Sequence, residues 1–239
     1  MKILGIIPAR YNSSRFPGKP LAQINNKSMI QMVWEQCKKA KLLSDCIVAT
    51  DDERIYNHVL SFGGKAMMTR DDHQSGTDRC FEVISKEKNT FDAVINIQGD
   101  EPLIDENYID KLGKTLTNGA QIATLAHPLN NDEVDNPNKV KVTFSEAKKA
   151  LYFSRSVIPF DRNSSNPKYF GHIGIYGYQT NVLKQIAQLP SSTLELAESL
   201  EQLRWLENDF SIVVDVVKNP SIGIDTPEDL EKLLKSLNN

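Results

Sequence analysis

The sequence is poor in cysteine and contains no long apolar run. Its 239 residues include three cysteines, Cys37, Cys46 and Cys80, which lie inside apolar patterns and form no CxxC spacing. This pattern favours buried free thiols in a reducing compartment. The apolar run at the N-terminus is too short for a signal peptide, and no other run reaches the length of a membrane span. We therefore expect a cytoplasmic protein.

The charged residues show no strong excess of one sign. The formal net charge is −3, and no basic stripe or polybasic run indicates nucleic acid or a membrane surface as a partner. An acidic substrate would therefore have to meet a local cluster of positive side chains. No predicted strand ends in GxGxxG, which argues against a nicotinamide-dependent oxidoreductase.

What the sequence does contain is an alternation of short apolar runs with amphipathic stretches. The first half predicts strands over residues 3–7, 46–50, 65–68 and 93–97, and helices over 29–40, between Asp51 and Gly63, and over 77–86. This β-α-β-α-β order predicts an α/β fold with a mostly parallel central sheet flanked by helices. A polar loop is expected from Ala9 to about Lys27.

The second half predicts a more mixed arrangement. Strands are expected over residues 122–127, 139–143, 173–178 and 210–216, and Thr226 and Asp229 form a box-like start for a last helix. Residues 193–207 are predicted to form one helix, with one face made of Leu196, Leu200, Leu203 and Leu206. Because no linker-like composition divides the chain, we interpret residues 1–239 as a single domain with an inserted or appended subregion.

A basic loop after the first strand is the first motif that could carry chemistry. It contains Pro8-Ala9-Arg10, Ser13-Ser14-Arg15 and Pro17-Gly18-Lys19-Pro20. Ligands of open parallel sheets bind beyond the carboxyl ends of the strands, where arginine and lysine can neutralise phosphate oxygens. The motif is not a Walker loop, because proline follows Gly18-Lys19. The alternative is a solvated basic loop, but a loop of this length needs a reason to be ordered.

Two acidic motifs could bind a divalent cation. Gln98-Gly99-Asp100-Glu101-Pro102 follows the strand at 93–97, and Gly223-Ile224-Asp225-Thr226-Pro227 precedes the last helix. Carboxylates at the end of a strand suit Mg²⁺, which takes oxygen ligands and keeps several waters. Alternatively, Asp100 caps the following helix and Asp225 complements a helix dipole. A pairing of the two aspartates across one metal ion would favour the site.

Two further motifs are explained better by structural roles than by catalytic ones. His172-Ile173-Gly174-Ile175-Tyr176-Gly177 lacks the spacing and the following helix of a dinucleotide fingerprint. A single histidine beside a strand is more often structural than catalytic. In Glu201-Gln202-Leu203-Arg204, the leucine belongs to the core, and the charges form a solvated face unless a ligand lies opposite them.

Together these segments resemble the 3-deoxy-manno-octulosonate (Kdo) cytidylyltransferase family. The similarity runs from Ile6 to about Leu230, and its segments, in order, are IPARYNSSRFPGKPL, ATDDERI, HQSGTDR, INIQGDEPLI, YFSRSVIP, HIGIYGY, LELAESLEQLRWLEN and IDTPEDL. The resemblance implies a nucleotide-diphospho-sugar transferase (Rossmann-like) α/β architecture, usually homodimeric. Residues of about 125–180 would contribute a small sugar-binding and dimerisation subregion.

The resemblance also implies roles for individual residues. The CTP phosphates would be bound by Arg10, Arg15 and Lys19. The rest of the nucleotide site would comprise Pro8, Ala9, Ser75, Gly76, Asp78 and Arg79. Mg²⁺ would be held by Asp100 and Asp225, which form the catalytic set with Arg10 and Lys19. The sugar acid would face Gln98, Arg155, His172, Tyr176, Glu201 and Gln202.

These roles predict an enzyme that transfers CMP from CTP to the anomeric 2-hydroxyl of Kdo, for bacterial lipopolysaccharide synthesis, and releases pyrophosphate. Such a reaction needs positioning and charge neutralisation more than a covalent protein intermediate. This need agrees with a sequence that shows no evident Ser-His-Asp or Cys-His set. The alternatives are a cytidylyltransferase for 8-amino-Kdo or sialic acid, and a nucleotide-binding regulator without turnover.

Overall fold

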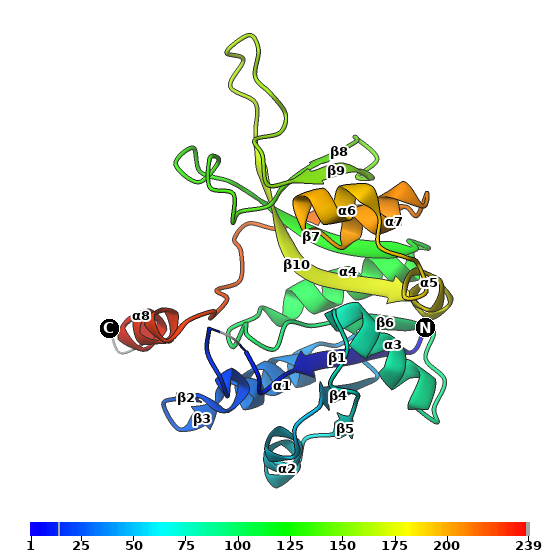
Figure 1. Ribbon diagram of the computed structural model, residues 1–239, viewed down its shortest axis with the longest axis vertical. Helices are drawn as coiled ribbons and strands as arrows, with labels where there is room; N and C mark the ends of the chain where they lie inside the picture. Colours follow the sequence, from blue (N-terminus) through cyan, green and yellow to red (C-terminus); the bar gives the residue numbers. More distant parts are fainter. Residues whose placement is uncertain (14, 238–239) are drawn as a thin grey trace.

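The computed structural model describes residues 1–13 and 15–237 and shows an α/β fold (Figure 1). Seven strands of the described chain follow one another in the order β11-β7-β10-β6-β1-β4-β5. They are β1 (Ile3–Ala9), β4 (Asp45–Thr50), β5 (Ala66–Met68), β6 (Ala93–Asn96), β7 (Ile122–Pro128), β10 (Phe170–Gln179) and β11 (Ile212–Val216). In this sheet β10 runs antiparallel to its neighbours β6 and β7, while the other neighbouring pairs are parallel. The predicted mostly parallel sheet is therefore confirmed.

Helices cover both faces of the sheet, and β1 contributes apolar side chains to the core on each face. Ile3 and Ile7 pack with α1 (Met29–Lys39), α2 (Glu53–Ser61) and α4 (Glu106–Thr117). Leu4 and Ile6 pack with α3 (Gly76–Lys86), α5 (Thr180–Ile186) and α7 (Gln202–Glu207) on the other side. Successive residues of a strand point to opposite faces, so the continuous apolar run fills two cores. The three cysteines are free and buried in these cores, as predicted.

The strand order reverses at β1. From β1 the chain passes to β4 and β5 on one side and then places β6 on the other side of β1. The loops that leave β1 and β6 therefore diverge from adjacent carboxyl ends, which creates a crevice suited to a ligand. Gly99 allows the loop after β6 to touch the end of β1, since a Cβ atom there would lie 2.6 Å from the Pro8 carbonyl oxygen.

The segment expected to be a polar loop, Ala9 to about Lys27, contains regular structure. β1 extends to Ala9, a 3₁₀ turn (η1) spans Lys19–Leu21, and β2 (Gln23–Ile24) pairs with β3 (Lys27–Ser28). Strands of two residues have no alternation that a sequence pattern could reveal. Ser14 of the predicted basic loop lies outside the described residues.

The predicted capping box at the start of α1 is only half formed. The Ser28 hydroxyl accepts a hydrogen bond from the Gln31 N–H, whereas the Gln31 side chain donates to Glu35 instead of returning to Ser28. The helix itself spans Met29–Lys39 and agrees with the prediction. A single hydrogen bond from the N-cap side chain to a backbone N–H group is sufficient to stabilise the first turn of the helix.

The single helix predicted over residues 193–207 is wrong. Two short helices, α6 (Thr193–Glu198) and α7 (Gln202–Glu207), are separated by Ser199, whose φ of 52° is left-handed. Arg155 donates hydrogen bonds to the carbonyl oxygens of Glu198 and Ser199, and a continuous helix would need these acceptors for its own N–H groups. As a result Leu196 is 69% exposed, while Leu200 and Leu203 are buried.

Residues of about 125–180 do not form a separate unit. β7 and β10 lie within the main sheet, whereas β8 (Lys141–Phe144) and the unpredicted β9 (Ala150–Ser154) extend from its upper part in Figure 1. A long arm joins β9 to β10 and projects from the body. The role of this region in sugar binding and dimerisation stays a prediction.

The last helix, α8 (Pro227–Leu237), packs away from the main sheet (Figure 1). Its Leu233 joins Ile24 of the β2–β3 hairpin and Ile224 in a third apolar cluster. Thr226 and Asp229 form the predicted reciprocal cap. Among the residues that the structure describes, no helix is both long and apolar enough to cross a membrane.

Candidate active site

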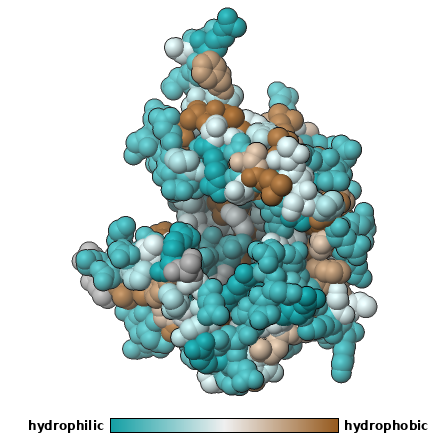
Figure 2. All heavy atoms as spheres, viewed as in Figure 1, coloured by the Kyte–Doolittle hydropathy of each residue, from teal (hydrophilic) through white to brown (hydrophobic). Residues whose placement is uncertain are grey.

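A cleft of about 420 Å³ lies at the crevice between the β1 and β6 loops. Figure 2 shows this face of the molecule hollowed between its upper and lower parts. The lining includes every predicted nucleotide-binding residue except Asp78, together with Gln98 and Asp100. A larger hollow of about 990 Å³ runs along α4, but it is lined by none of the predicted site residues. The sequence motifs therefore converge on one cleft.

Lys19 joins the two acidic motifs. Its ammonium Nζ lies 2.7 Å from Asp100 Oδ2 and 3.5 Å from Asp225 Oδ1, so both carboxylates are within reach of one nitrogen. The same Nζ donates a hydrogen bond of 2.9 Å to the Ile224 carbonyl oxygen. The predicted meeting of Asp100 and Asp225 at the basic loop is confirmed, although a lysine stands between them.

The backbone fixes this arrangement. The Ile224 N–H donates to the Asp100 carbonyl oxygen at 2.9 Å, which ties the segment before α8 to the β6–α4 loop. Asp105 accepts the hydrogen bond that caps α4, so the alternative role of Asp100 as a helix cap is wrong. Arg15 Nη2 lies 3.1 Å from the same Asp225 Oδ1.

The two carboxylates suit a divalent cation whose remaining ligands are waters and substrate oxygens. Within residues 1–13 and 15–237, no group of three or more His, Cys, Asp or Glu side chains could hold a metal ion. Mg²⁺ is commonly bound by one or two carboxylates together with waters and substrate phosphates. The Lys19 ammonium shows that a positive charge is accommodated between Asp100 and Asp225. The donor set thus fits Mg²⁺ delivered with a nucleotide, and the metal itself stays a prediction.

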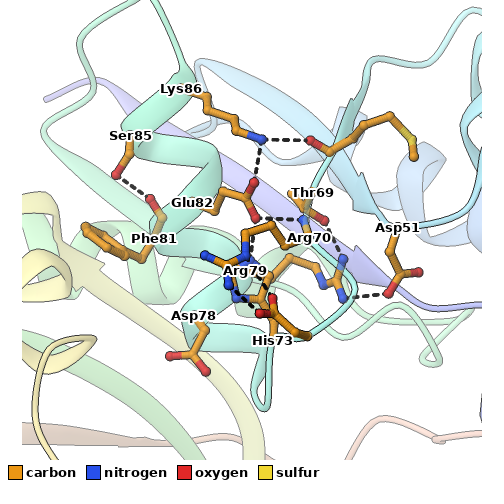
Figure 3. Close-up of polar contacts among 12 residues, drawn as sticks. Asp51, Thr69, Arg70, His73, Asp78, Arg79, Phe81, Glu82, Ser85 and Lys86 are labelled. Atoms are coloured by element: carbon orange, nitrogen blue, oxygen red, sulfur yellow. Dashed lines mark hydrogen bonds and ion pairs between the residues drawn. The ribbon is translucent and has the colours of Figure 1, made fainter.

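Arg10 and Arg79 concentrate positive charge at the other end of the cleft. The fully buried Arg79 donates to Asp51 Oδ2 at 2.9 Å and to the Thr69 hydroxyl (Figure 3). Burial, followed by repulsion from Arg79, lowers the pKa of Arg10. An arginine keeps its charge despite such a shift. An anionic phosphate in the cleft would therefore relieve the repulsion between two guanidinium groups.

The loop before α3 is held by Glu82. This carboxylate accepts hydrogen bonds from the Arg70 N–H at 2.9 Å, from His73 and, as an ion pair, from Lys86 (Figure 3). Arg10 in turn donates to the His73 carbonyl oxygen. Burial by itself would raise the pKa of Glu82, but the bonds from Lys86, His73 and Arg70 outweigh it and lower the pKa to about 2.

We expect Glu82→Gln to lower the free energy of unfolding by about 1.5–3 kcal/mol at pH 7, because hydrogen bonds to a charged group are lost. The folded-state pKa lies below the ordinary value of 4.5. The stabilisation is therefore present above that value and disappears as the pH falls toward 2. Urea unfolding at pH 7 and at pH values approaching 3 tests this, with the exposed Glu146→Gln as control. A difference between wild type and Glu82→Gln that stays constant with pH would contradict the assignment.

The start of α3 separates the cleft from a second cavity. Ser75 and Asp78 form a capping box in which each side chain accepts the other's backbone N–H, at 3.1 and 3.2 Å. Ser75 and Gly76 line the cleft, and Ser75 also lines an adjoining cavity of about 290 Å³ together with Asp78. The predicted contacts of these three residues with the cytosine and ribose stay a prediction.

Only two of the six predicted sugar-facing residues line these cavities. Gln98 lies in the cleft and donates Nε2 to the Gly174 carbonyl oxygen at 2.7 Å. Glu201 lines the adjoining cavity and accepts a hydrogen bond of 2.9 Å from the Thr77 hydroxyl. Burial raises the pKa of Glu201. Its neighbour Gln202 is buried, and Arg155 is engaged with α6.

His172 and Tyr176 belong to an aromatic cluster, with their ring centroids 5.3 Å apart. Burial lowers the pKa of His172 to about 3, so its ring is neutral at pH 7 and is paired with the Thr124 hydroxyl at 2.9 Å. This environment agrees with the structural explanation of His172. The buried Tyr176 hydroxyl has no hydrogen-bond partner in the described part of the chain, which is unusual for a buried polar group. Sugar contacts by these residues stay a prediction.

Five described residues of the cleft were given no individual role, and three of them, Ser13, Pro20 and Gly99, belong to the basic and acidic motifs. The other two stand outside those motifs. Asn12 and Gln74 lie in the cleft lining between residues that were predicted. Both fall inside the segments IPARYNSSRFPGKPL and HQSGTDR. Their place in these segments indicated that the surrounding loop would line the cleft, but it did not indicate which side chains of the loop would do so.

A basic cluster and a carboxylate pair thus face each other at the switch point of an α/β sheet, and these features are those of a nucleotidyltransferase. The family model described as Cytidylyltransferase matches residues 4–214. The 3-deoxy-manno-octulosonate cytidylyltransferases of Parabacteroides distasonis and Bacteroides thetaiotaomicron are 50% and 51% identical, over 100% of this chain and 99% of each relative. The chain belongs to the 3-deoxy-manno-octulosonate cytidylyltransferase family.

Solved structures agree with this assignment. A CMP:2-keto-3-deoxy-manno-octonic acid synthetase complexed with CTP is 44% identical, with a TM-score of 0.96 over 100% of this chain and 99% of that chain. A 4-diphosphocytidyl-2C-methyl-D-erythritol synthase from Anaerococcus prevotii is only 13% identical and shares the fold, with a TM-score of 0.66 over 100% of this chain and 97% of that chain. The predicted nucleotidyltransferase architecture is therefore confirmed.

Proposed function

We propose that this chain transfers CMP from CTP to the anomeric 2-hydroxyl of Kdo and releases pyrophosphate, which activates Kdo for lipopolysaccharide synthesis. The observation that carries the proposal is the position of Lys19 between Asp100 and Asp225 at the mouth of the basic cleft. The names of the relatives that are about half identical over their whole length support the choice of CTP and Kdo.

The residues of this chain would act by positioning and by neutralising charge. The sugar hydroxyl oxygen forms a bond to the α-phosphorus of CTP while the bond from that phosphorus to the bridging oxygen breaks. Pyrophosphate leaves with the electron pair, and the hydroxyl proton passes to solvent. Arg10, Arg15 and Lys19 would orient the triphosphate and neutralise the charge that grows on the leaving group. Mg²⁺ held by Asp100 and Asp225 would supply further neutralisation and make the hydroxyl more acidic.

Pyrophosphate release from CTP and Kdo, with and without Mg²⁺, tests the proposal. We expect release only when CTP, Kdo and Mg²⁺ are all present. Parallel reactions with sialic acid, with 8-amino-Kdo and with no sugar are the controls. Turnover with one of the other sugar acids and not with Kdo would assign a different acceptor. CTP binding without turnover on any sugar would indicate a nucleotide-binding regulator and would contradict the proposed enzymatic activity.

The homodimer is part of the same proposal. Two large apolar side chains of the region 125–180 lie in solvent, with Phe160 84% and Leu151 63% exposed. Exposed apolar side chains of this size are suited to a contact with a second copy. The mass of the protein in solution, measured by light scattering, decides between one chain and two. A cytoplasmic location agrees with the three free cysteines.

A further inference from the structure

The segment that carries Asp225 to the cleft has no regular secondary structure. We define residues 218–224 as the connector between β11 and α8; it passes in an extended path to α8 (Figure 1). Lys218, Asn219, Pro220, Ile222 and Gly223 are all exposed. A segment with so few buried side chains is held mainly by individual hydrogen bonds. The position of Asp225 therefore depends on those bonds.

Tyr108 provides one such bond from outside the cleft. Its hydroxyl donates to the Asn219 carbonyl oxygen at 2.6 Å. Tyr108 lies in the first turn of α4, the helix that follows the loop of Asp100. The bond therefore joins the connector to the helix that directly follows the Asp100 loop. At the far end of the connector, Ile224 is bonded to Asp100 and Lys19 as described above.

A buried polar pair lies between these two attachment points. Glu101 Oε2 and the Ser221 hydroxyl are both buried and form no well-aligned hydrogen bond with any described residue. The Ser221 hydroxyl lies next to the Glu101 carboxyl. Because neither of these two atoms forms a hydrogen bond within the described chain, the Tyr108 hydroxyl is the firmer side-chain attachment of the connector, near its start.

We propose that Tyr108 is a positioning residue, whose hydroxyl holds the connector so that Asp225 stays opposite Asp100. The proposal rests on the proposed function, in which these two carboxylates share a divalent ion. The Tyr108 ring packs against the core cluster that contains Ile109 and Leu112. Removal of the hydroxyl alone therefore leaves the packing in place and tests the hydrogen bond.

The experiment compares Tyr108→Phe with wild type and with Tyr56→Phe. Tyr56 is half-buried on α2, and its hydroxyl makes no hydrogen bond to the residues that the structure describes. The first measurement is calorimetric binding of CTP, without sugar, at a series of free Mg²⁺ concentrations. Loss of one hydrogen bond should raise the Mg²⁺ concentration at which CTP affinity is half-maximally enhanced by about threefold to tenfold. Tyr56→Phe should leave this concentration unchanged.

The second measurement is turnover. Tyr108→Phe should need about threefold to tenfold more Mg²⁺ for half-maximal activity, with kcat at saturating Mg²⁺ within about twofold of wild type. A lower melting temperature with an unchanged Mg²⁺ requirement would show a merely structural role and overturn the proposal. If wild type fails to turn over Kdo, the proposed function fails, but the calorimetric comparison with CTP alone still tests Tyr108.

Discussion

Replacing Lys19 by alanine is expected to lower kcat by about 100- to 1000-fold while the protein stays folded. The Lys19 side chain is only 14% exposed, and its ammonium group lies between Asp100 and Asp225 beside the cleft. Its removal takes away a positive charge that would offset the negative charge developing on pyrophosphate. Steady-state pyrophosphate release measures the effect, and circular dichroism confirms the fold.

Lys27→Ala is the matched control for this variant. Lys27 follows the same loop and pairs with Glu35 at 2.6 Å on the surface, outside the cleft. Exposed pairs contribute little, so kcat should remain within about twofold of wild type. If Lys19→Ala retained turnover within tenfold of wild type, the role assigned to this lysine would be wrong.

Asp100→Asn should reduce turnover by about 1000-fold or more, because the carboxylate that we propose as a metal ligand loses its charge. Asparagine keeps the size of the side chain, and its amide oxygen can still accept the hydrogen bond from Lys19. The Asp100 carbonyl oxygen that binds Ile224 is also unaffected. A loss of turnover would therefore result from the missing negative charge and not from altered packing. Activity measured across Mg²⁺ concentrations gives the size of the effect.

The exposed Asp132→Asn controls for the chemical change alone and should behave as wild type. Asp100→Asn with normal turnover and an unchanged magnesium requirement would place the metal site elsewhere. Loss of turnover in both variants would indicate a general sensitivity of the protein to this substitution.

The central sheet could be predicted because its strands carry their own pattern. β1 is apolar at successive positions and fills a core on each face, which is the pattern of a buried parallel strand. Short elements carry no such pattern. β2 and β3 have two residues each, and they form where Ile24 packs against α8, far away in the sequence. This contact cannot be inferred from local spacing.

The break between α6 and α7 shows a second limit of the sequence pattern. The spacing of Leu200 and Leu203 is helical, and both residues are buried. Arg155, more than 40 residues away, takes the carbonyl groups of Glu198 and Ser199. Tertiary hydrogen bonds therefore decide where the helix ends, and local propensity does not.

The basic loop and the Asp100 motif were predictable because each follows a strand, β1 or β6, whose end faces the crevice. The Asp225 motif instead precedes α8 and reaches this place through the connector. Asp100 and Asp225 are brought together as expected. Their bridging by Lys19 was not expected, since spacing cannot reveal which of several cations reaches a carboxylate. The sugar-facing residues were harder to predict than the cleft residues. His172 lies in a strand and Gln202 in a helix, and the burial of these elements depends on their neighbours.

The most direct test is the anomalous signal of Mn²⁺, as a substitute for Mg²⁺, in crystals of the protein grown with CTP. We expect one peak at about 2.1 Å from a carboxylate oxygen of Asp100 and of Asp225, with the Lys19 ammonium moved toward the phosphates. A peak bound only to the phosphates, with Lys19 still bridging the two carboxylates, would contradict the account.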